Sequence, residues 1–428
     1  MALTKVSPSL FQVSNNITSV TVGGSANTIS LTFDSNGVIT GASNNAVSVA
    51  NTAITGNIIS SQIASVSGSA ITANTVANSA FQTGSVENYL NASGGSLSGR
   101  NRIINGAMMI DQRNAGSSLT PTNGQYTLDR WIAYMAASAK FSVQQDTSAN
   151  TVAGFTSSMK ITSLSAYSVG SADEFNINQA IEGFNFGDLR WGTANAAPIT
   201  VSFWVRSSLT GTHGGCVRSY DISRSYPFSY TIVAANTWEK KTITVPGDTS
   251  GTWVGLSNAG AVWLTFGLGT GSTLSNTAGA WVAGNYTNAT GAVSLVGTNG
   301  ATWYVTGVQI EKGSQATPFE YCQYGTELAL CQRYYEVLTN PYGLAMSCFN
   351  STDAYANLVY TQKRATPGVS LGSVGSFYSA GAARTLSSIT AQNITQNNLQ
   401  FKVTGSGFTG GNAGHYDFNG NFTISAEL

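Results

Sequence analysis

The sequence predicts an all-β protein built from many short strands. Charged residues make up only 9% of its 428 residues, against a usual level of about 25%. Turn-forming residues are abundant, with 47 glycines and frequent Ser, Thr and Asn. Hydrophobic residues reach 42% and aromatic residues 10%, which is enough to build cores from half-buried strands. A chain of this length is expected to form several domains.

The charge balance and hydropathy exclude two kinds of partner. The 19 basic and 19 acidic residues are scattered, so no basic stripe is available for a phosphate backbone and nucleic-acid binding is not expected. No run of about twenty apolar residues occurs, which argues against membrane insertion. Residues 1–6 lack the pattern of a signal peptide, so we expect the chain to be made and assembled in a cytoplasm.

The N-terminal region, residues 1–45, predicts a small β-structure. Ile29, Leu31 and Phe33 alternate with polar residues, as in a half-buried strand. A turn signal follows at 34–37, and a second strand begins at Val38. This region is too small to bury a core of its own.

Residues 46–99 contain a five-residue repeat that ends in a Gly/Ser-rich joint. A period of five fits neither a helix nor a strand, and one large residue per repeat cannot close a core within one chain. We therefore predict a trimeric fibre shaft, with a single-chain pentapeptide-type coil and a linker as alternatives. The repeated apolar positions are Val66, Ile71, Val76, Phe81 and Val86, and Ile54 and Ile59 keep the same step.

Residues 100–336 predict one β-sandwich or jelly roll. Alternating apolar positions indicate strands at 199–206, 262–268 and 302–310, separated by Gly- and Asn-rich turns. In the last of these strands, Tyr304, Val308 and Ile310 are expected on one face. Trp131, Phe203 and Trp303 are expected in the core.

A short helix is predicted next, followed by a second, smaller β-domain at 337–428. Thr326 is expected to cap the helix, Leu328, Cys331 and Tyr335 follow at helical spacing, and Pro341 with Gly343 is expected to close it. Period-two alternation then returns at 399–404 and 422–424.

Several motifs resemble those of bacteriophage tail fibre proteins with a carbohydrate-binding-module-like jelly-roll domain. Residues 101–108 (NRIINGAM) and 126–131 (YTLDRW) resemble the start of that domain. Residues 306–313 (TGVQIEKG) and 316–320 (ATPFE) resemble its last strand, and 328–335 (LALCQRYY) the helix after it. The segment 363–367 (KRATP) resembles part of the C-terminal β-domain of such fibres.

The resemblance implies a homotrimeric virion fibre. Its N-terminal part would attach to phage tail or adaptor proteins, its shaft would carry the load, and its distal β-domains would bind a host surface glycan or another envelope component. Members of this family share core motifs and not a common set of ligand-binding residues, so the resemblance identifies no binding residue in this chain. The alternative is a structural or decoration fibre of the virion, on the head or collar, that binds no receptor.

The residues that could support catalysis or bind a metal are few. His213 and His415 lie in turn-like contexts without a nucleophile motif, so surface-loop positions are expected. Asp173, Glu174, Glu182 and Asp188 form the densest acidic group, and we expect Asp173 and Glu174 to cap loops or contact calcium rather than cleave a glycosidic bond. No enzyme activity or cofactor is predicted, and calcium is left unassigned. The scattered cysteines, expected to be buried and apolar, are Cys216, Cys322, Cys331 and Cys348.

A glycan site would combine exposed aromatic rings with neighbouring polar side chains. Aromatic residues in loop-like contexts are the candidates, although Tyr and Trp also seal sheet edges for purely structural reasons. The candidate ligand-binding residues are Tyr220, Asp221, Arg224, Tyr226, Trp281, Tyr286, Tyr378, His415 and Tyr416.

Overall fold

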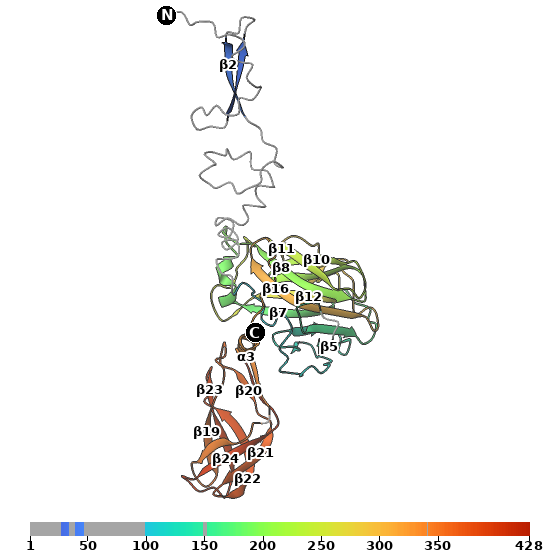
Figure 1. Cartoon of the computed structure of the whole chain (residues 1–428). Coiled ribbons are helices and arrows are strands. Elements are labelled where there is room, and N and C mark those ends of the chain that lie inside the picture. Colours follow the sequence, from blue (N-terminus) through green and yellow to red (C-terminus); the bar gives the residue numbers. More distant parts are fainter. Residues whose placement is uncertain (1–26, 34–38, 47–98, 149–151, 340) are drawn as a thin grey trace, which may run out of the picture. The chain divides into compact units, whose positions relative to one another are not determined.

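The computed structural model describes residues 27–33, 39–46, 99–148, 152–339 and 341–428 (Figure 1). The chain divides into two units, residues 1–80 and 81–428. The first unit contains an antiparallel hairpin of β1 (Asn27–Phe33) and β2 (Ile39–Ala46), with Asn27 opposite Ala46. The two predicted N-terminal strands are therefore confirmed. The predicted turn at 34–37 and the five-residue repeat lie outside the described residues.

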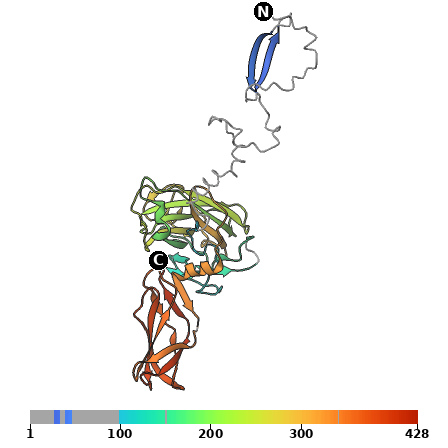
Figure 2. The ribbon, with the colours of Figure 1, turned by 60° about the vertical axis from the view of Figure 1, so that its left-hand side comes forward.

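The second unit begins with a sandwich of two antiparallel sheets, seen from two sides in Figures 1 and 2. The seven-stranded sheet has the order β14-β10-β9-β12-β7-β4-β3. Its strands are β3 (Gln125–Tyr126), β4 (Ile132–Met135), β7 (Glu174–Glu182), β9 (Gly211–Ser219), β10 (Arg224–Ile232), β12 (Gly260–Thr270) and β14 (Val282–Ala283). The five-stranded sheet has the order β11-β8-β16-β6-β5. Its strands are β5 (Phe141–Asp146), β6 (Ser158–Ser163), β8 (Ile199–Ser207), β11 (Glu239–Val245) and β16 (Thr302–Lys312).

The core of the sandwich lies between the two sheets, as the alternating pattern predicts. Phe203 and Val205 of β8 meet Leu264 and Phe266 of β12 in one cluster of buried side chains. Because successive side chains of a strand point to opposite faces, the remaining residues of these strands form the outer faces of the sandwich. The predicted core positions Trp131, Phe203 and Trp303 are confirmed.

One predicted face assignment is wrong. The register of β16 against β8 shifts between Thr306 and Gln309, which marks a bulge. Ahead of the bulge Trp303 and Val305 face the core, and after it Val308 and Ile310 do. Tyr304 therefore points to the outer face. A bulge of this kind reverses which alternate residues face inward, and periodicity alone does not reveal it.

The predicted helix exists, but both predicted ends are wrong. Helix α3 (Tyr324–Gln332) begins two residues before Thr326, and its N-cap residue, Gln323, makes no side-chain capping bond. It ends before Tyr335, because Tyr335 pairs with Ser425 at the start of β17 (Tyr335–Leu338). Smaller elements of the sandwich are η4 (Gly183–Asn185), η5 (Gly187–Leu189), β13 (Ser275–Asn276) and β15 (Asn288–Ala289).

The remaining strands form a closed six-stranded barrel and a three-stranded sheet. The barrel order is β18-β19-β23-β22-β21-β24, and the small sheet has the order β17-β25-β20. The predicted alternation in β23 and β25 is confirmed, because Leu399, Phe401, Val403, Phe422 and Ile424 are all buried. The strands are β18 (Leu344–Cys348), β19 (Asp353–Val359), β20 (Gly368–Ser370), β21 (Ser373–Ser379), β22 (Ala382–Gln392), β23 (Asn398–Ser406), β24 (Ala413–Asn419) and β25 (Phe422–Ser425).

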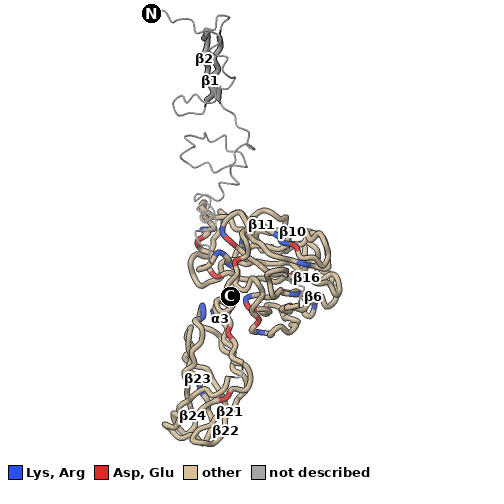
Figure 3. The backbone as a smooth tube through the Cα atoms, in the orientation of Figure 1, with Lys and Arg blue, Asp and Glu red and all other residues tan. Residues whose placement is uncertain are grey.

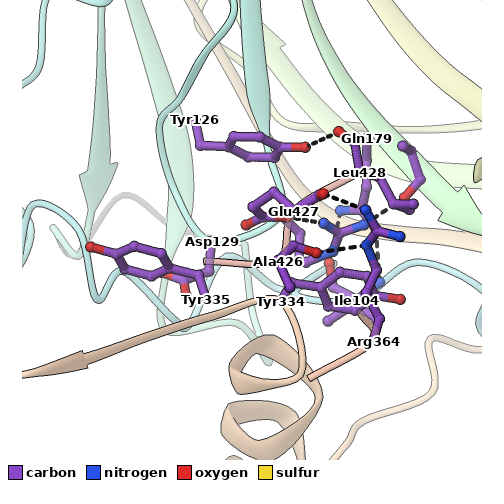
Figure 4. A network of polar contacts seen from close by, with 12 residues as sticks. Ile104, Tyr126, Asp129, Gln179, Tyr334, Tyr335, Arg364, Ala426, Glu427 and Leu428 are labelled. Carbon is purple, nitrogen blue, oxygen red and sulfur yellow. Dashed lines mark hydrogen bonds and ion pairs between the residues drawn. The ribbon is translucent and has the colours of Figure 1, made fainter. Parts of the chain in front are cut away.

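A polar network joins residues 426–428 to the sandwich (Figure 4). The Glu427 carboxylate accepts hydrogen bonds from Arg113, at 2.7 Å, and from Arg130. The Arg130 guanidinium lies 3.5 Å from the centre of the Tyr334 ring. Arg364 donates to the backbone carbonyls of Ala426 and Glu427, each at 2.6 Å. Charged residues are sparse along the described chain (Figure 3), so a cluster of charged side chains at one place is a distinctive feature.

Among the described residues, no helix is both long enough and apolar enough to cross a membrane.

Candidate functional site

The first group of predicted ligand residues surrounds the turn between β9 and β10. Tyr220 is half-buried and stacks on Trp263, with ring centres 5.1 Å apart and planes inclined by 11°. Asp221 is exposed, and its carboxylate accepts hydrogen bonds from Ser219 and Ser223. These contacts organise the turn itself.

The Arg224 guanidinium is not free to bind the hydroxyl groups of a sugar, because it is paired with an acidic side chain. Its Nε and Nη2 donate to the two carboxylate oxygens of Asp248, at 2.7 and 2.8 Å. The Asp248 side chain is only 3% exposed, so this is a bidentate pair with one buried partner. The pair connects the start of β10 to the segment after β11.

Tyr226 and Trp281 pack into the sandwich, so the prediction of exposed loop aromatics is wrong for Tyr226. Tyr226 lies within β10, is 6% exposed and contacts the Trp281 ring at 5.4 Å. Trp281 forms edge-on contacts with Trp191 and Trp253, and its indole N–H donates to the carbonyl of Pro246. These ring contacts cover apolar side chains at this end of the sandwich, and Trp281 itself is half-buried. Tyr286 is half-buried, and its backbone N–H donates to Ser225 Oγ.

The second group of predicted residues belongs to the barrel. Tyr378 of β21 and His415 of β24 lie opposite each other and stack with ring centres 5.1 Å apart. Both are exposed, and both lie in strands rather than in loops. Tyr416 is fully buried in the barrel core, because its neighbour His415 takes the outward position. The expected exposure of Tyr416 is therefore wrong.

His213 also departs from its predicted place in a surface loop. It lies within β9, is 2% exposed and stacks on Tyr230. Its Nε2 is 3.1 Å from the carbonyl oxygen of Leu209. Burial lowers its pKa, and the bond to Leu209 opposes that shift only in part.

The four clustered acidic residues are each engaged by neighbours. Asp173 caps a loop, as predicted, by accepting hydrogen bonds from the Tyr167 hydroxyl and the Gly170 N–H. Glu174 and Glu182 are the end residues of β7, which places them about 26 Å apart along the strand. Glu182 is bound by Arg333 and Tyr334, Glu174 accepts a bond from Asn176, and Asp188 pairs with Arg102.

The four cysteines are free thiols, and three of them are buried as predicted, whereas Cys322 is only half-buried. Within the described residues, no group of three or more His, Cys, Asp or Glu side chains is placed to hold a metal ion.

The barrel contains a cleft that the sequence-based candidates do not include. Two adjoining hollows of about 400 Å³ each share Ser347, Tyr355 and Gln400 in their walls. We call them together the barrel cleft. The cleft opens because β18 and β19 pair at only two positions, so the strands diverge beyond Ser347. Met346 and Ala356, which are largely buried, line the first of these hollows.

The walls of the barrel cleft contain no charged residue and include two aromatic ones, Tyr355 and Phe349. Tyr355 stands edge-on to the exposed ring of Phe349 at 5.8 Å. Gln400 Oε1 accepts hydrogen bonds from Gln392 and Asn393, which fixes the amide and leaves its Nε2 without a partner among the described residues. The Asn357 side chain has no hydrogen-bond partner among them either. Lys402, which lies 5.7 Å from the centre of the Tyr355 ring, is paired with Asp353 at 3.1 Å.

The signal for this cleft was present in the sequence but is weak. Residues 353–359 alternate, with Ala354, Ala356 and Leu358 inward and Tyr355 and Asn357 outward. The pattern predicts a strand, but not that its neighbour diverges from it. The divergence depends on tertiary pairing between residues that are not adjacent in sequence.

No protein-family model and no curated protein matches the sequence. Among solved structures, the enzymatically active domain of tailspike protein 4 from bacteriophage CBA120 is similar at 11% identity and a TM-score of 0.27, over 50% of this chain and 21% of that one. This chain thus spans about a fifth of that domain's length.

Two carbohydrate-binding modules are also similar. A family 61 module in complex with β-1,4-galactotriose has 10% identity and a TM-score of 0.26, over 50% of this chain and 99% of that one. A family 11 module from Clostridium thermocellum, in complex with a β-1,3-1,4-mixed-linked tetrasaccharide, has 11% identity and a TM-score of 0.23, over 47% and 98%.

Proposed function

We propose that this protein is a homotrimeric bacteriophage tail fibre that binds a glycan on the host cell surface without cleaving it. The barrel cleft is the observation that carries the proposal. Its aromatic wall, its unpaired amide groups and its lack of unpaired charge suit a neutral sugar. The sequence motifs at both ends of the sandwich and the five-residue repeat support a fibre whose N-terminal region attaches to tail or adaptor proteins of the virion.

Binding in the cleft would combine stacking with amide hydrogen bonds. The face of Tyr355 would cover the C–H surface of a sugar ring, while Gln400 Nε2 and the Asn357 amide would contact hydroxyl or acetamido groups. A single shallow site of this kind is weak. Three copies on one fibre would raise the avidity without any new contact.

Binding of the 428-residue chain to immobilised neutral oligosaccharides tests this proposal. The probes are β-linked oligomers of galactose, glucose and N-acetylglucosamine. We expect saturable binding to at least one of them, weakened about tenfold by Tyr355→Ala, because the lost contact of roughly 50 Å² stabilises binding by about 1.3 kcal/mol. Tyr342→Ala, which removes a tyrosine that is 79% exposed and outside the cleft, serves as the matched control and should bind as the wild type does.

The other outcomes separate the alternatives. A folded trimer that binds neither these probes nor intact cells would favour a structural or decoration fibre on the head or collar. Release of shortened oligosaccharides would show a depolymerase. A solution mass near 44.5 kDa, instead of about three times that value, would contradict the trimer.

A further inference from the structure

The outer face of the five-stranded sheet carries three basic residues that are far apart in the sequence. Lys160 of β6 lies opposite Tyr304 of β16, which lies opposite Arg206 of β8. Lys240 of β11 lies opposite Trp204, two residues before Arg206. We call these residues, together with Trp238, the cationic face. Strand spacing places the Cα atoms of neighbouring cations roughly 8–10 Å apart across the sheet.

The Arg206 guanidinium is held in place by aromatic rings and not by an acidic partner. Its central carbon lies 4.1 Å from the centre of the Tyr304 ring and 5.8 Å from that of Trp238. Its Nε is buried without a hydrogen-bond partner, and its side chain makes no ion pair with any described residue. A planar guanidinium stacked in this way presents its remaining N–H groups edge-on, in the fork geometry that matches a carboxylate or sulfate.

Acidic residues near this face do not neutralise it. The Glu239 carboxylate is taken by Lys241 and by the N–H groups of Val233 and Ala234. Asp146, at the end of β5, accepts a bond from the Ser148 N–H and forms no ion pair with Lys160. Within the described residues neither Lys160 nor Lys240 forms an ion pair, in a chain of which only 9% of residues are charged. The local charge is therefore positive although the net charge of the chain is zero.

We propose that the cationic face binds an acidic polysaccharide, with Arg206 contacting one acid group and Lys160 and Lys240 flanking it. The half-buried Trp204 and Trp238 offer apolar surface for the sugar rings between the acid groups. Three cations suit a sparsely charged polymer better than a nucleic acid, because neutralising a phosphate backbone draws on many cationic contacts. This site is independent of the barrel cleft, and it stands whether or not the cleft binds a neutral glycan.

Matched pairs of polymers test the proposal on the 428-residue chain. The probes are polygalacturonate with its methyl ester, for carboxylate, and dextran sulfate with dextran, for sulfate. We expect at least one charged polymer to bind and its uncharged counterpart to bind at least tenfold more weakly. Binding should weaken as salt is raised, because the contacts are partly exposed.

Two substitutions of equal charge locate the binding. Arg206→Gln should weaken binding about tenfold, whereas Arg190→Gln, which removes an exposed cation elsewhere on the sandwich, should change it less than twofold. Equal effects of the two would show general electrostatic attraction and overturn the site. The proposal is also overturned if no charged polymer binds, if the uncharged counterparts bind equally well, or if a single-stranded DNA oligonucleotide binds more tightly than either polymer. Tyr355→Ala should leave this binding unchanged, which separates it from failure of the barrel cleft.

Discussion

The buried ion pairs of Glu427 predict that Glu427→Ala destabilises the sandwich, although the residue lies far along the chain from it. In the wild type the carboxylate, 7% exposed, neutralises Arg130, whose side chain is 1% exposed. Arg113 makes the second ion pair at 2.7 Å. After the substitution, Arg130 retains one hydrogen bond, to the Ala180 carbonyl, and its contact with the Tyr334 ring.

The expected loss follows from leaving a buried cation without its anion. Breaking a buried pair by removing one partner typically costs about 3–5 kcal/mol. Arg113 is more exposed and adds less. With a urea dependence of about 3 kcal/mol per M, the sandwich should unfold at a urea concentration lower by about 1 M or more.

Tryptophan fluorescence measures this selectively. All eight tryptophans lie between Trp131 and Trp303, so their emission reports the sandwich while the barrel contributes none. Urea titrations of the wild type, Glu427→Ala and Glu427→Gln would be compared at neutral pH. The glutamine variant keeps an acceptor oxygen and should fall between the other two.

The half-buried pair between Asp353 and Lys402 lies in the barrel and supplies the control, so Asp353→Asn should leave the tryptophan transition where it is. A shift below about 1 kcal/mol for Glu427→Ala would refute the reasoning. It would show that residues 426–428 detach before the sandwich unfolds, and that the Arg130 guanidinium becomes hydrated when they detach.

Three further predictions concern stability and reactivity. Burial raises the pKa of Asp129 to about 6, so the folded state holds a proton that the unfolded chain releases. The free energy of unfolding should therefore fall by on the order of 2 kcal/mol as pH rises from about 4 to about 6. Urea titrations across this pH range should show the decrease, and Asp129→Asn should abolish it. Burial raises the pKa of the half-buried Cys322 thiol to about 11, so a thiol reagent at neutral pH should modify this residue slowly. The same reagent should modify the buried Cys216 only when the protein unfolds. Mass spectrometry of the labelled protein measures both reactions. A Cβ at position 375 would lie 1.9 Å from the Asp417 carbonyl oxygen, so Gly375→Ala should lower barrel stability by about 1–3 kcal/mol or more in circular dichroism melts and leave the tryptophan transition unchanged.

The residues predicted to bind a ligand differ in how far a local sequence pattern determines their exposure. Tyr378 and His415 were predicted as exposed aromatic and polar residues, and they are exposed. Tyr226 and Tyr416 occur in similar sequence contexts but are buried, because strand register decides which neighbour points inward. The residue types next to a tyrosine in the sequence do not reveal the register of its strand.

The sequence alone determined the all-β class, the alternating strands and the core positions of β8 and β12, because side-chain alternation is a property of a few consecutive residues. Tertiary structure decided the rest. The bulge in β16, the divergence of β18 from β19 and the gathering of Lys160, Arg206 and Lys240 on one face all depend on which strands pair, and in what register. Those pairings join residues that are far apart in the chain, and no local pattern specifies them.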